Sequence, residues 1–256
     1  MGLFEKKHKQ KQFVSGSDET RKTLHKNLEF TAIEQYKLIR ANLDFTLPEN
    51  EKCPVIGVTS SMRGEGKSTT AVNLSYAFAE KGSKVLLIDA DLRIPSIAKK
   101  LEIENSFGLA DLLRGKGAQI SEFKSHLLSN WFVLPSGDIP PNPSELLGSG
   151  RMENVLNQLR EIFDCIIVDL PPVNIVSDAI SISSLISGMI VVIREEHTEK
   201  KELERCFRQL RLSNVNILGC VMNAAKSGSG SYGKYKRYKY YKYYKYYQSD
   251  SKDAKK

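Results

Sequence analysis

The stretch PVIGVTSSMRGEGKST, residues 54–69, decides the fold of this chain. Its first half, PVIGVTSS (54–61), is apolar and contains β-branched residues, which predicts a buried strand. The second half, SMRGEGKS (61–68), has the spacing of a phosphate-binding loop, except that Ser61 stands where a glycine is usual. A helical pattern, STTAVNLSYAFAEKGS (68–83), follows at once. A strand, a glycine-rich turn and a helix in this order predict a nucleotide site.

The residue types in the turn suit the binding of phosphate. Backbone N–H groups of such a turn point at phosphate oxygens, and the start of the helix adds positive potential. The two glycines allow close approach of the backbone, the lysine can reach the outer phosphates, and the serine hydroxyl can hold Mg²⁺. A plain surface turn is the alternative, but a complete Gly-Lys-Ser-Thr between a strand and a helix favours phosphate binding. The candidate nucleotide-binding residues are Arg63, Gly64, Glu65, Gly66, Lys67, Ser68 and Thr69.

Three acidic residues stand where predicted strands end. VLLIDADLR (85–93) carries Asp89 and Asp91, and CIIVDLPP carries Asp169. In an open parallel sheet, ligands bind at the carboxyl ends of the strands. Mg²⁺ prefers oxygen ligands and needs only one or two carboxylates beside phosphate oxygens. We therefore expect the three carboxylates to lie together near the phosphates of the nucleotide.

Apolar strands that alternate with helices predict a parallel sheet covered on both faces. With right-handed connections this becomes a doubly wound, mostly parallel α/β sheet of the P-loop NTPase class. We predict a domain over 31–225, a flexible basic arm over 1–30 and a disordered tail over 226–256. Further strands are expected at 85–91, 131–137, 165–172, 188–194 and 215–223, and helices at 31–45, 107–115, 143–163 (one or two) and 199–213.

The net charge of +8 is unevenly distributed over the 256 residues. Residues 226–256 hold ten Lys/Arg and two Asp/Glu, so the rest of the chain is formally neutral. The four cysteines have no metal-binding spacing, and Cys165 and Cys220 fall in apolar runs that predict buried strands, so we expect reduced structural thiols. Apolar runs are too short for a membrane span, which predicts a cytoplasmic protein that reaches the membrane through a partner.

The tail is the second unusual feature. RYKYYKYYKYYQSD (237–250) alternates Tyr with Lys and has no apolar face to bury. A segment of this composition is free to present its hydroxyl groups to an active site one at a time. The tail tyrosines are Tyr232, Tyr235, Tyr238, Tyr240, Tyr241, Tyr243, Tyr244, Tyr246 and Tyr247.

These motifs resemble a known family. The P-loop, DADLR (89–93) and VDLPP (168–172) look like the deviant-Walker ATPases of the Min and Par type, although Met62 replaces their signature lysine. With EQYKLIRANLDF (34–45) and the Tyr-rich tail, the chain resembles the bacterial tyrosine kinases of capsule and exopolysaccharide synthesis. The resemblance implies a cytoplasmic kinase polypeptide that uses ATP and Mg²⁺ and phosphorylates tail tyrosines between subunits.

The resemblance also implies roles for individual residues. Lys67 would contact the β- and γ-phosphates. Ser68 and Asp169 would hold Mg²⁺, with Asp91 in support. Asp89 would accept the proton of the tyrosine, and Asn223 would lie near adenine. Glu34 and Arg40 match the helical motif through which subunits of the family contact one another, but the middle position is Lys37 where the family has Arg. The alternative is that these three residues form an ordinary solvated face of ion pairs.

The family further implies partners: a transmembrane adaptor that resembles a polysaccharide co-polymerase and completes the ATP site, a cognate phosphotyrosine phosphatase, and other copies of the chain in a closed ring. The chain would then lie at the inner face of the cell membrane. Nucleic acid is not expected as a partner.

Two other functions fit the same residues. A Par/Min-type ATPase could use its basic aromatic tail to bind DNA or RNA, because Lys pairs with phosphates and Tyr stacks on bases. Alternatively, the tail could be an adhesive or membrane-surface segment, with the nucleotide acting only as an assembly switch. Both alternatives predict that incubation with ATP yields no phosphotyrosine.

Overall fold

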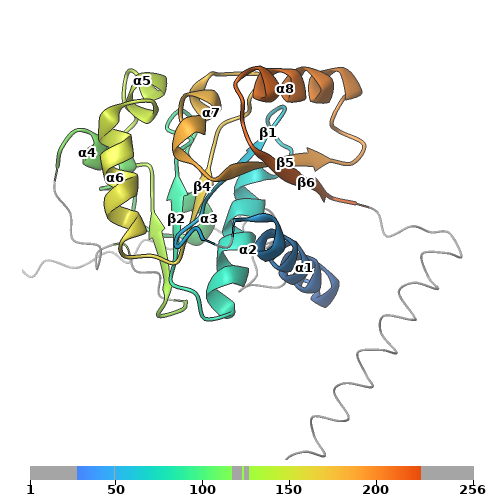
Figure 1. Ribbon diagram of the computed structural model, residues 1–256, viewed down its shortest axis with the longest axis horizontal. Helices are drawn as coiled ribbons and strands as arrows, with labels where there is room; N and C mark the ends of the chain where they lie inside the picture. The colour runs from blue at the N-terminus through green and yellow to red at the C-terminus, as the bar shows by residue number, and fades with distance from the viewer. Residues whose placement is uncertain (1–27, 49, 117–122, 124–126, 226–256) are drawn as a thin grey trace, which may run out of the picture.

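The computed structural model describes residues 28–48, 50–116, 123 and 127–225. Their core is a single six-stranded sheet with the order β3-β2-β4-β1-β5-β6 (Figure 1). All five pairings between neighbouring strands are parallel, as the apolar, β-branched runs predict. The strands are β1 (Val55–Ser60), β2 (Val85–Asp89), β3 (Trp131–Leu134), β4 (Cys165–Asp169), β5 (Gly188–Arg194) and β6 (Ile217–Asn223).

The longer helices follow the predicted segments, whereas the short helices over 97–101, 178–181 and 183–185 lie outside them. The segment 143–163 forms two helices, which meet at Gly148 and Ser149. Ser149 is the N-cap of the second one, and its hydroxyl accepts a hydrogen bond from the Met152 N–H. The helices are α1 (Phe30–Thr46), α2 (Lys67–Glu80), α3 (Ile97–Leu101), α4 (Leu109–Leu113), α5 (Pro143–Leu147), α6 (Gly150–Arg160), α7 (Asp178–Ser181), the 3₁₀ helix η2 (Ser183–Leu185) and α8 (Lys200–Leu212).

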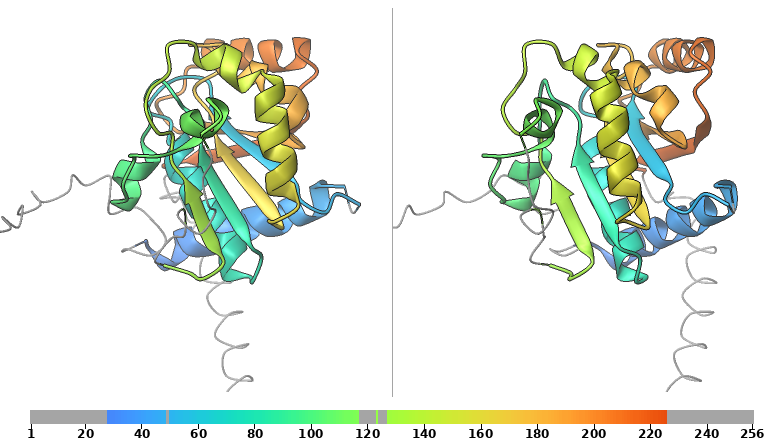
Figure 2. Two further views of the ribbon diagram at one scale, coloured as in Figure 1. Left: turned by 90° about the vertical axis from the view of Figure 1, so that its left-hand side faces the viewer. Right: turned by 60° about the vertical axis from the view of Figure 1, so that its left-hand side comes forward.

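Helices cover both faces of the sheet (Figure 2). Successive residues of a strand point to opposite faces. On β4, Ile166 and Val168 join the core beneath α4, α6 and α8, whereas Cys165 and Ile167 join the core beneath α1 and α2. This arrangement confirms the predicted doubly wound sheet, and it brings the carboxyl ends of the strands to one edge.

The prediction that the last strand is buried is wrong. β6 is only partly buried along its length. It pairs with β5 alone, but β3 at the opposite edge pairs with β2 alone and is buried throughout, so the exposure of β6 reflects incomplete cover of its faces rather than its edge position. Cys220 is exposed, and the side chain of Met222 is 58% exposed. Cys53, Cys165 and Cys206 are buried free thiols, and burial raises the pKa of both Cys53 and Cys206 to about 12. None of the helices in the described segments is long and apolar enough to cross a membrane.

Helix α1 lies outside the sheet and packs on α2. Leu43 and Leu47 insert into the core shared with α2. Arg40 Nη1 donates a hydrogen bond to the Ala77 carbonyl of α2 at 2.8 Å, and Lys81 forms a 2.6 Å ion pair with Asp44. This packing anchors α1 to the helix that begins at the phosphate loop.

Candidate nucleotide and metal site

The phosphate loop connects β1 to α2 at the carboxyl edge of the sheet. Gly64 and Gly66 have φ values of +81° and +97°, a region of conformational space that favours glycine. A Cβ atom on Gly66 would lie 1.9 Å from Nδ2 of Asn223, so this position excludes a side chain by space as well as by conformation. The loop therefore has the backbone shape that the GEGKS motif predicts.

Lys67 lies at the centre of the site. Its Nζ is 2.8 Å from Asp91 Oδ2 and 3.4 Å from Asp169 Oδ1, and it also donates to Ser68 Oγ at 3.3 Å. Burial lowers the pKa of Lys67, but Asp169 and Asp91 outweigh it, so that the pKa lies above its usual value. The ammonium group thus carries its positive charge where outer phosphates would bind.

Asp169 is fully buried at the end of β4. Burial raises its pKa, against the opposing effects of Lys67 and of a hydrogen bond from Ser68. Its Oδ2 is buried and has no hydrogen-bond partner among the described residues. An unsatisfied carboxylate oxygen beside a serine hydroxyl fits a hard cation with oxygen ligands, either directly or through water. Ser68, Asp91 and Asp169 therefore suit Mg²⁺.

Asp89 lies beside this cluster at the end of β2 and is fully buried. Its Oδ2 accepts hydrogen bonds from the N–H groups of Ser96 and Ile97, both at 3.0 Å. Burial, followed by the nearby Asp169, raises the pKa of Asp89 to about 7. The three predicted carboxylates do converge around Lys67, whereas the role of Asp89 as a base stays a prediction.

Arg93 and Asp178 form a contact beside the site that the sequence does not predict. Arg93 follows Asp91 by two residues, and its guanidinium holds the buried Asp178 of α7 through two hydrogen bonds of 2.9 and 3.0 Å. Ser144 of α5 donates to the same carboxylate at 2.5 Å. This cluster fastens the loop after β2 to α5 and α7. Its partners lie 34 to 85 residues apart, so no local motif indicates them.

Asn223 ends β6 beside the phosphate loop. Its Nδ2 donates to the Glu65 carbonyl at 3.0 Å, and its Oδ1 accepts from the Ala224 N–H. The amide nitrogen carries two donors, so one N–H remains for a ligand. Contact of Asn223 with adenine stays a prediction.

The predicted subunit-contact residues of α1 have partners within their own chain. Lys37 pairs with Glu34 at 3.2 Å and with Glu80 of α2 at 3.8 Å, and Arg40 bonds α2 as described above. Their contact with another subunit stays a prediction. The nine tail tyrosines and the basic arm, apart from residues 28–30, lie outside the described residues.

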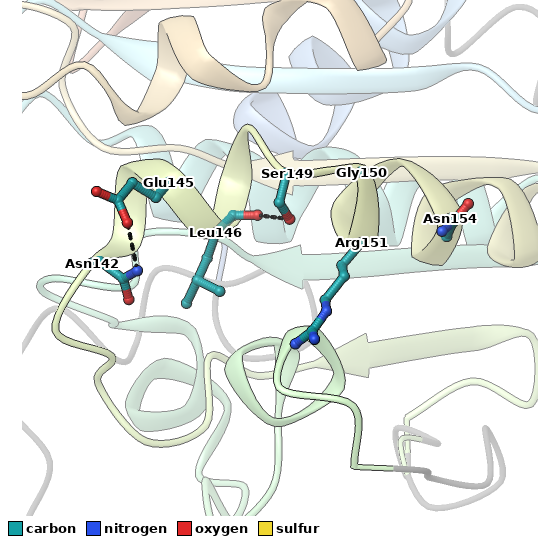
Figure 3. Close-up of a pocket in the computed structure, with 7 residues that line it drawn as sticks. All are labelled: Asn142, Glu145, Leu146, Ser149, Gly150, Arg151 and Asn154. Carbon is teal, nitrogen blue, oxygen red and sulfur yellow. Dashed lines mark hydrogen bonds between the residues drawn. The ribbon is translucent and has the colours of Figure 1, made fainter.

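A pocket of about 550 Å³ lies elsewhere, on α5 and the start of α6 (Figure 3). Its polar groups are bonded locally: Asn142 donates to Glu145, and the Arg151 guanidinium reaches the Leu113 carbonyl. None of the predicted site residues lines it. The candidate site is therefore the loop and its carboxylates, not this hollow.

Comparison with known proteins agrees with the site. The family model described as ParA, NUBPL iron-transfer P-loop NTPase, matches residues 52–242. Tyrosine-protein kinase YwqD of Bacillus subtilis is 38% identical over 193 residues, which cover 75% of this chain and 81% of that protein. Putative tyrosine-protein kinase CapB of Staphylococcus aureus is 32% identical over 200 residues, 78% of this chain and 87% of the relative.

A solved structure supports the same assignment. The kinase domain of the Escherichia coli tyrosine kinase ETK superposes with a TM-score of 0.69 at 30% identity, covering 78% of this chain and 79% of that domain. Sequence and fold therefore agree over the residues that build the phosphate loop and the three carboxylates. The chain belongs to the bacterial tyrosine-protein kinases, a branch of the ParA-type P-loop NTPases.

Proposed function

We propose that this chain transfers the γ-phosphoryl group of ATP to the tyrosines of its own C-terminal tail, between subunits, and so regulates the synthesis and export of capsular or extracellular polysaccharide. The observation that carries the proposal is Lys67, held between Asp91 and Asp169 at the mouth of a phosphate-binding loop. A buried cation beside carboxylates that suit Mg²⁺ is the arrangement that phosphoryl transfer requires.

The reaction depends mainly on position and charge. The N–H groups of the phosphate loop orient the phosphates, and Lys67 neutralises charge on the transferring group. Ser68, Asp91 and Asp169 would hold Mg²⁺, which would offset the negative charge of the phosphate oxygens. Lys67 must turn from the carboxylates toward the phosphates, which leaves Asp91 and Asp169 available as ligands.

The attacking phenol has a pKa of about 10 and must lose its proton during the transfer. A carboxylate within hydrogen-bond reach can accept it. With a pKa raised to about 7, Asp89 has a proton affinity suited to this task near neutral pH. Because both its oxygens accept backbone hydrogen bonds from the loop after β2, that loop must yield for Asp89 to reach a substrate.

The place where the tail begins favours its use as a substrate. β6 ends at Asn223, on the same edge as the phosphate loop, and the tail starts three residues later. If residues 226–241 formed a flexible coil, its span would be roughly 20–23 Å, which would be enough to reach a site on this edge. Each phosphotyrosine would add about −1.5 to −2 charges, so four or five would neutralise the tail.

Assembly through α1 is part of the proposal. Phe30, Leu38 and Phe45 are exposed on this helix, and together with Glu34 they occur at helical spacing on one face. A largely apolar face that carries Glu34, with Lys37 paired to it at the margin, suits contact with another copy of the chain. The transmembrane adaptor, the cognate phosphatase and the position at the inner membrane face follow from family membership and belong to this proposal.

Replacing Lys67 with Met tests the proposed active site. We expect Lys67→Met to lose at least 100-fold in tail phosphorylation, because phosphoryl-transfer enzymes depend on this charge. Phosphotyrosine is measured by immunoblot after incubation of the purified chain with Mg-ATP. The matched control is Lys200→Met, which removes an exposed lysine of α8 paired only with Glu204. Undiminished phosphotyrosine in Lys67→Met would refute this active site.

A further inference from the structure

Glu65 is a buried acid inside a loop that binds anions. Its side chain is 1% exposed, although its neighbours Arg63 and Gly64 are exposed. The carboxylate accepts hydrogen bonds from Ser61 Oγ at 2.7 Å and from the Met62 N–H at 3.0 Å. A negative charge here opposes the binding of phosphate and occupies an N–H group of the loop. Electrostatics alone therefore gives no reason for a carboxylate at this position.

The third partner of this carboxylate comes from a distant part of the chain. Thr198, in the connection between β5 and α8, donates to Glu65 Oε1 at 2.6 Å. The Thr198 hydroxyl also accepts from the Arg194 N–H at 2.9 Å. Because a charge-assisted hydrogen bond of this length is among the stronger ones, it ties the loop to the end of β5.

The outward-facing carbonyls of the loop are engaged on the same side. Arg194 Nη1 donates to the Gly64 carbonyl at 2.9 Å, and Asn223 Nδ2 donates to the Glu65 carbonyl at 3.0 Å. His197 Nε2 lies 3.4 Å from the Arg63 carbonyl. Since phosphate-binding N–H groups must face inward, partners that hold the carbonyls outward fix that orientation.

We propose that Glu65 and Thr198 are positioning residues for the phosphates of the nucleotide, and that with Arg194 and Asn223 they form a brace that holds the loop open for phosphate. The inference rests on the proposed nucleotide site but not on tyrosine as the acceptor. It extends the binding machinery to the ends of β5 and β6, which the P-loop motif does not include.

The brace and simple electrostatics predict opposite changes in nucleotide affinity when Glu65 loses its charge. Glu65→Gln removes a negative charge near the phosphates, so charge alone predicts tighter nucleotide binding. A positioning role predicts weaker binding, because the amide group of Gln turns a donor toward the Met62 N–H or the Thr198 hydroxyl. The direction of the change in dissociation constant therefore distinguishes the two explanations.

Thr198 provides the second arm of the test. We expect Thr198→Val to weaken nucleotide binding about tenfold, the effect of losing one hydrogen bond to a charged group. Thr198→Ser keeps the hydroxyl and is expected to restore binding to within about twofold. Thr46→Val is the matched control, because the Thr46 hydroxyl bonds only the Asn42 carbonyl of its own helix.

The dissociation constant of Mg-ADP, measured by isothermal titration calorimetry, is the readout, with the melting temperature of each nucleotide-free variant alongside. Weaker binding by Glu65→Gln and Thr198→Val, with recovery in Thr198→Ser, supports the brace. Unchanged binding by Thr198→Val, or tighter binding by Glu65→Gln, overturns it. If Glu65→Gln does not fold, the Thr198 pair still decides. Since no phosphotyrosine is measured, failure of the proposed kinase activity would not be confused with failure of the brace.

Discussion

At the centre of the site, one ammonium group separates two buried carboxylates. Three acidic side chains this close would repel one another, and Lys67 offsets that repulsion. The ammonium group can attract the negative phosphates of a nucleotide, and the carboxylates can attract its magnesium ion. Residues that bind the ligand thus neutralise one another until it arrives.

The position of Gly66 leads to a prediction about the loop. Gly66→Ala is expected to weaken nucleotide binding at least tenfold, because the new Cβ would collide with Asn223 and displace the brace. Gly82→Ala is the matched control. Gly82 also has a positive φ, +111°, but nothing lies within 4 Å of the Cβ position, so only about 1–2 kcal/mol of backbone strain is expected. Equal nucleotide dissociation constants for the two variants would contradict the proposed clash.

Asp89 leads to a prediction about pH. Its pKa of about 7 in the folded protein lies above its usual value of 3.8, so the folded chain holds this proton more tightly than the unfolded chain. The stabilising contribution is complete below about pH 4 and is lost as the pH rises through 7. Between pH 5 and 8, the free energy of unfolding of the nucleotide-free wild type should therefore fall by about 2–4 kcal/mol more than that of Asp89→Asn. Urea unfolding at four pH values measures it, and parallel profiles would contradict the shift.

At the scale of elements, the regular parts of the fold could be predicted from the sequence and the long-range contacts could not. The GEGKS spacing predicts the loop and both elements beside it, and strand-end acids predict the convergence of Asp91 and Asp169. The bonds from Thr198 to Glu65 and from Arg93 to Asp178 join residues 133 and 85 positions apart. They depend on which strand ends become neighbours. That order follows from packing, not from any local pattern.

Exposure of β6 was missed for the same reason. An apolar run predicts a strand but does not show how completely other elements cover its two faces, because a partly covered strand also needs apolar residues on the covered face. β3 and β6 are both edge strands, yet only β3 is buried throughout. For this reason the prediction that Cys220 is buried is wrong.

Helix α1 combines an inward and an outward face, and the two can be separated by mutation. Phe45→Ser removes a side chain that is 90% exposed, so we expect little change in melting temperature and a lower assembled mass in light scattering. Arg40→Ala removes the hydrogen bond to Ala77 and should cost about 1–2 kcal/mol in the free energy of unfolding. Unchanged assembly in Phe45→Ser would contradict the role of this face in subunit contact.

At the scale of the whole molecule, charge is separated between the body and the tail. Residues 1–225 are formally neutral, while 226–256 carry the net charge of +8. β6 ends next to the edge that bears Asp91 and Asp169, so an unmodified tail would be attracted to the site it is proposed to enter. Phosphorylation of several tyrosines would reverse the sign of the tail and turn this attraction into repulsion. Substrate binding and product release would then be governed by the same charges.

The central claim is transfer of phosphate from ATP to the tail of another subunit. Two variants that cannot label their own tails test it most directly when mixed: Lys67→Met, which keeps its tail but loses its site, and a chain with all nine tail tyrosines changed to Phe, which keeps its site. The chains carry tags of different size and are incubated with Mg-ATP, alone and together, beside the wild type. We predict no phosphotyrosine on either chain alone and strong phosphotyrosine on the Lys67→Met chain in the mixture. If the wild type carries phosphotyrosine but the Lys67→Met chain in the mixture does not, transfer between subunits is contradicted. If the wild type carries no phosphotyrosine, self-phosphorylation of the tail is contradicted.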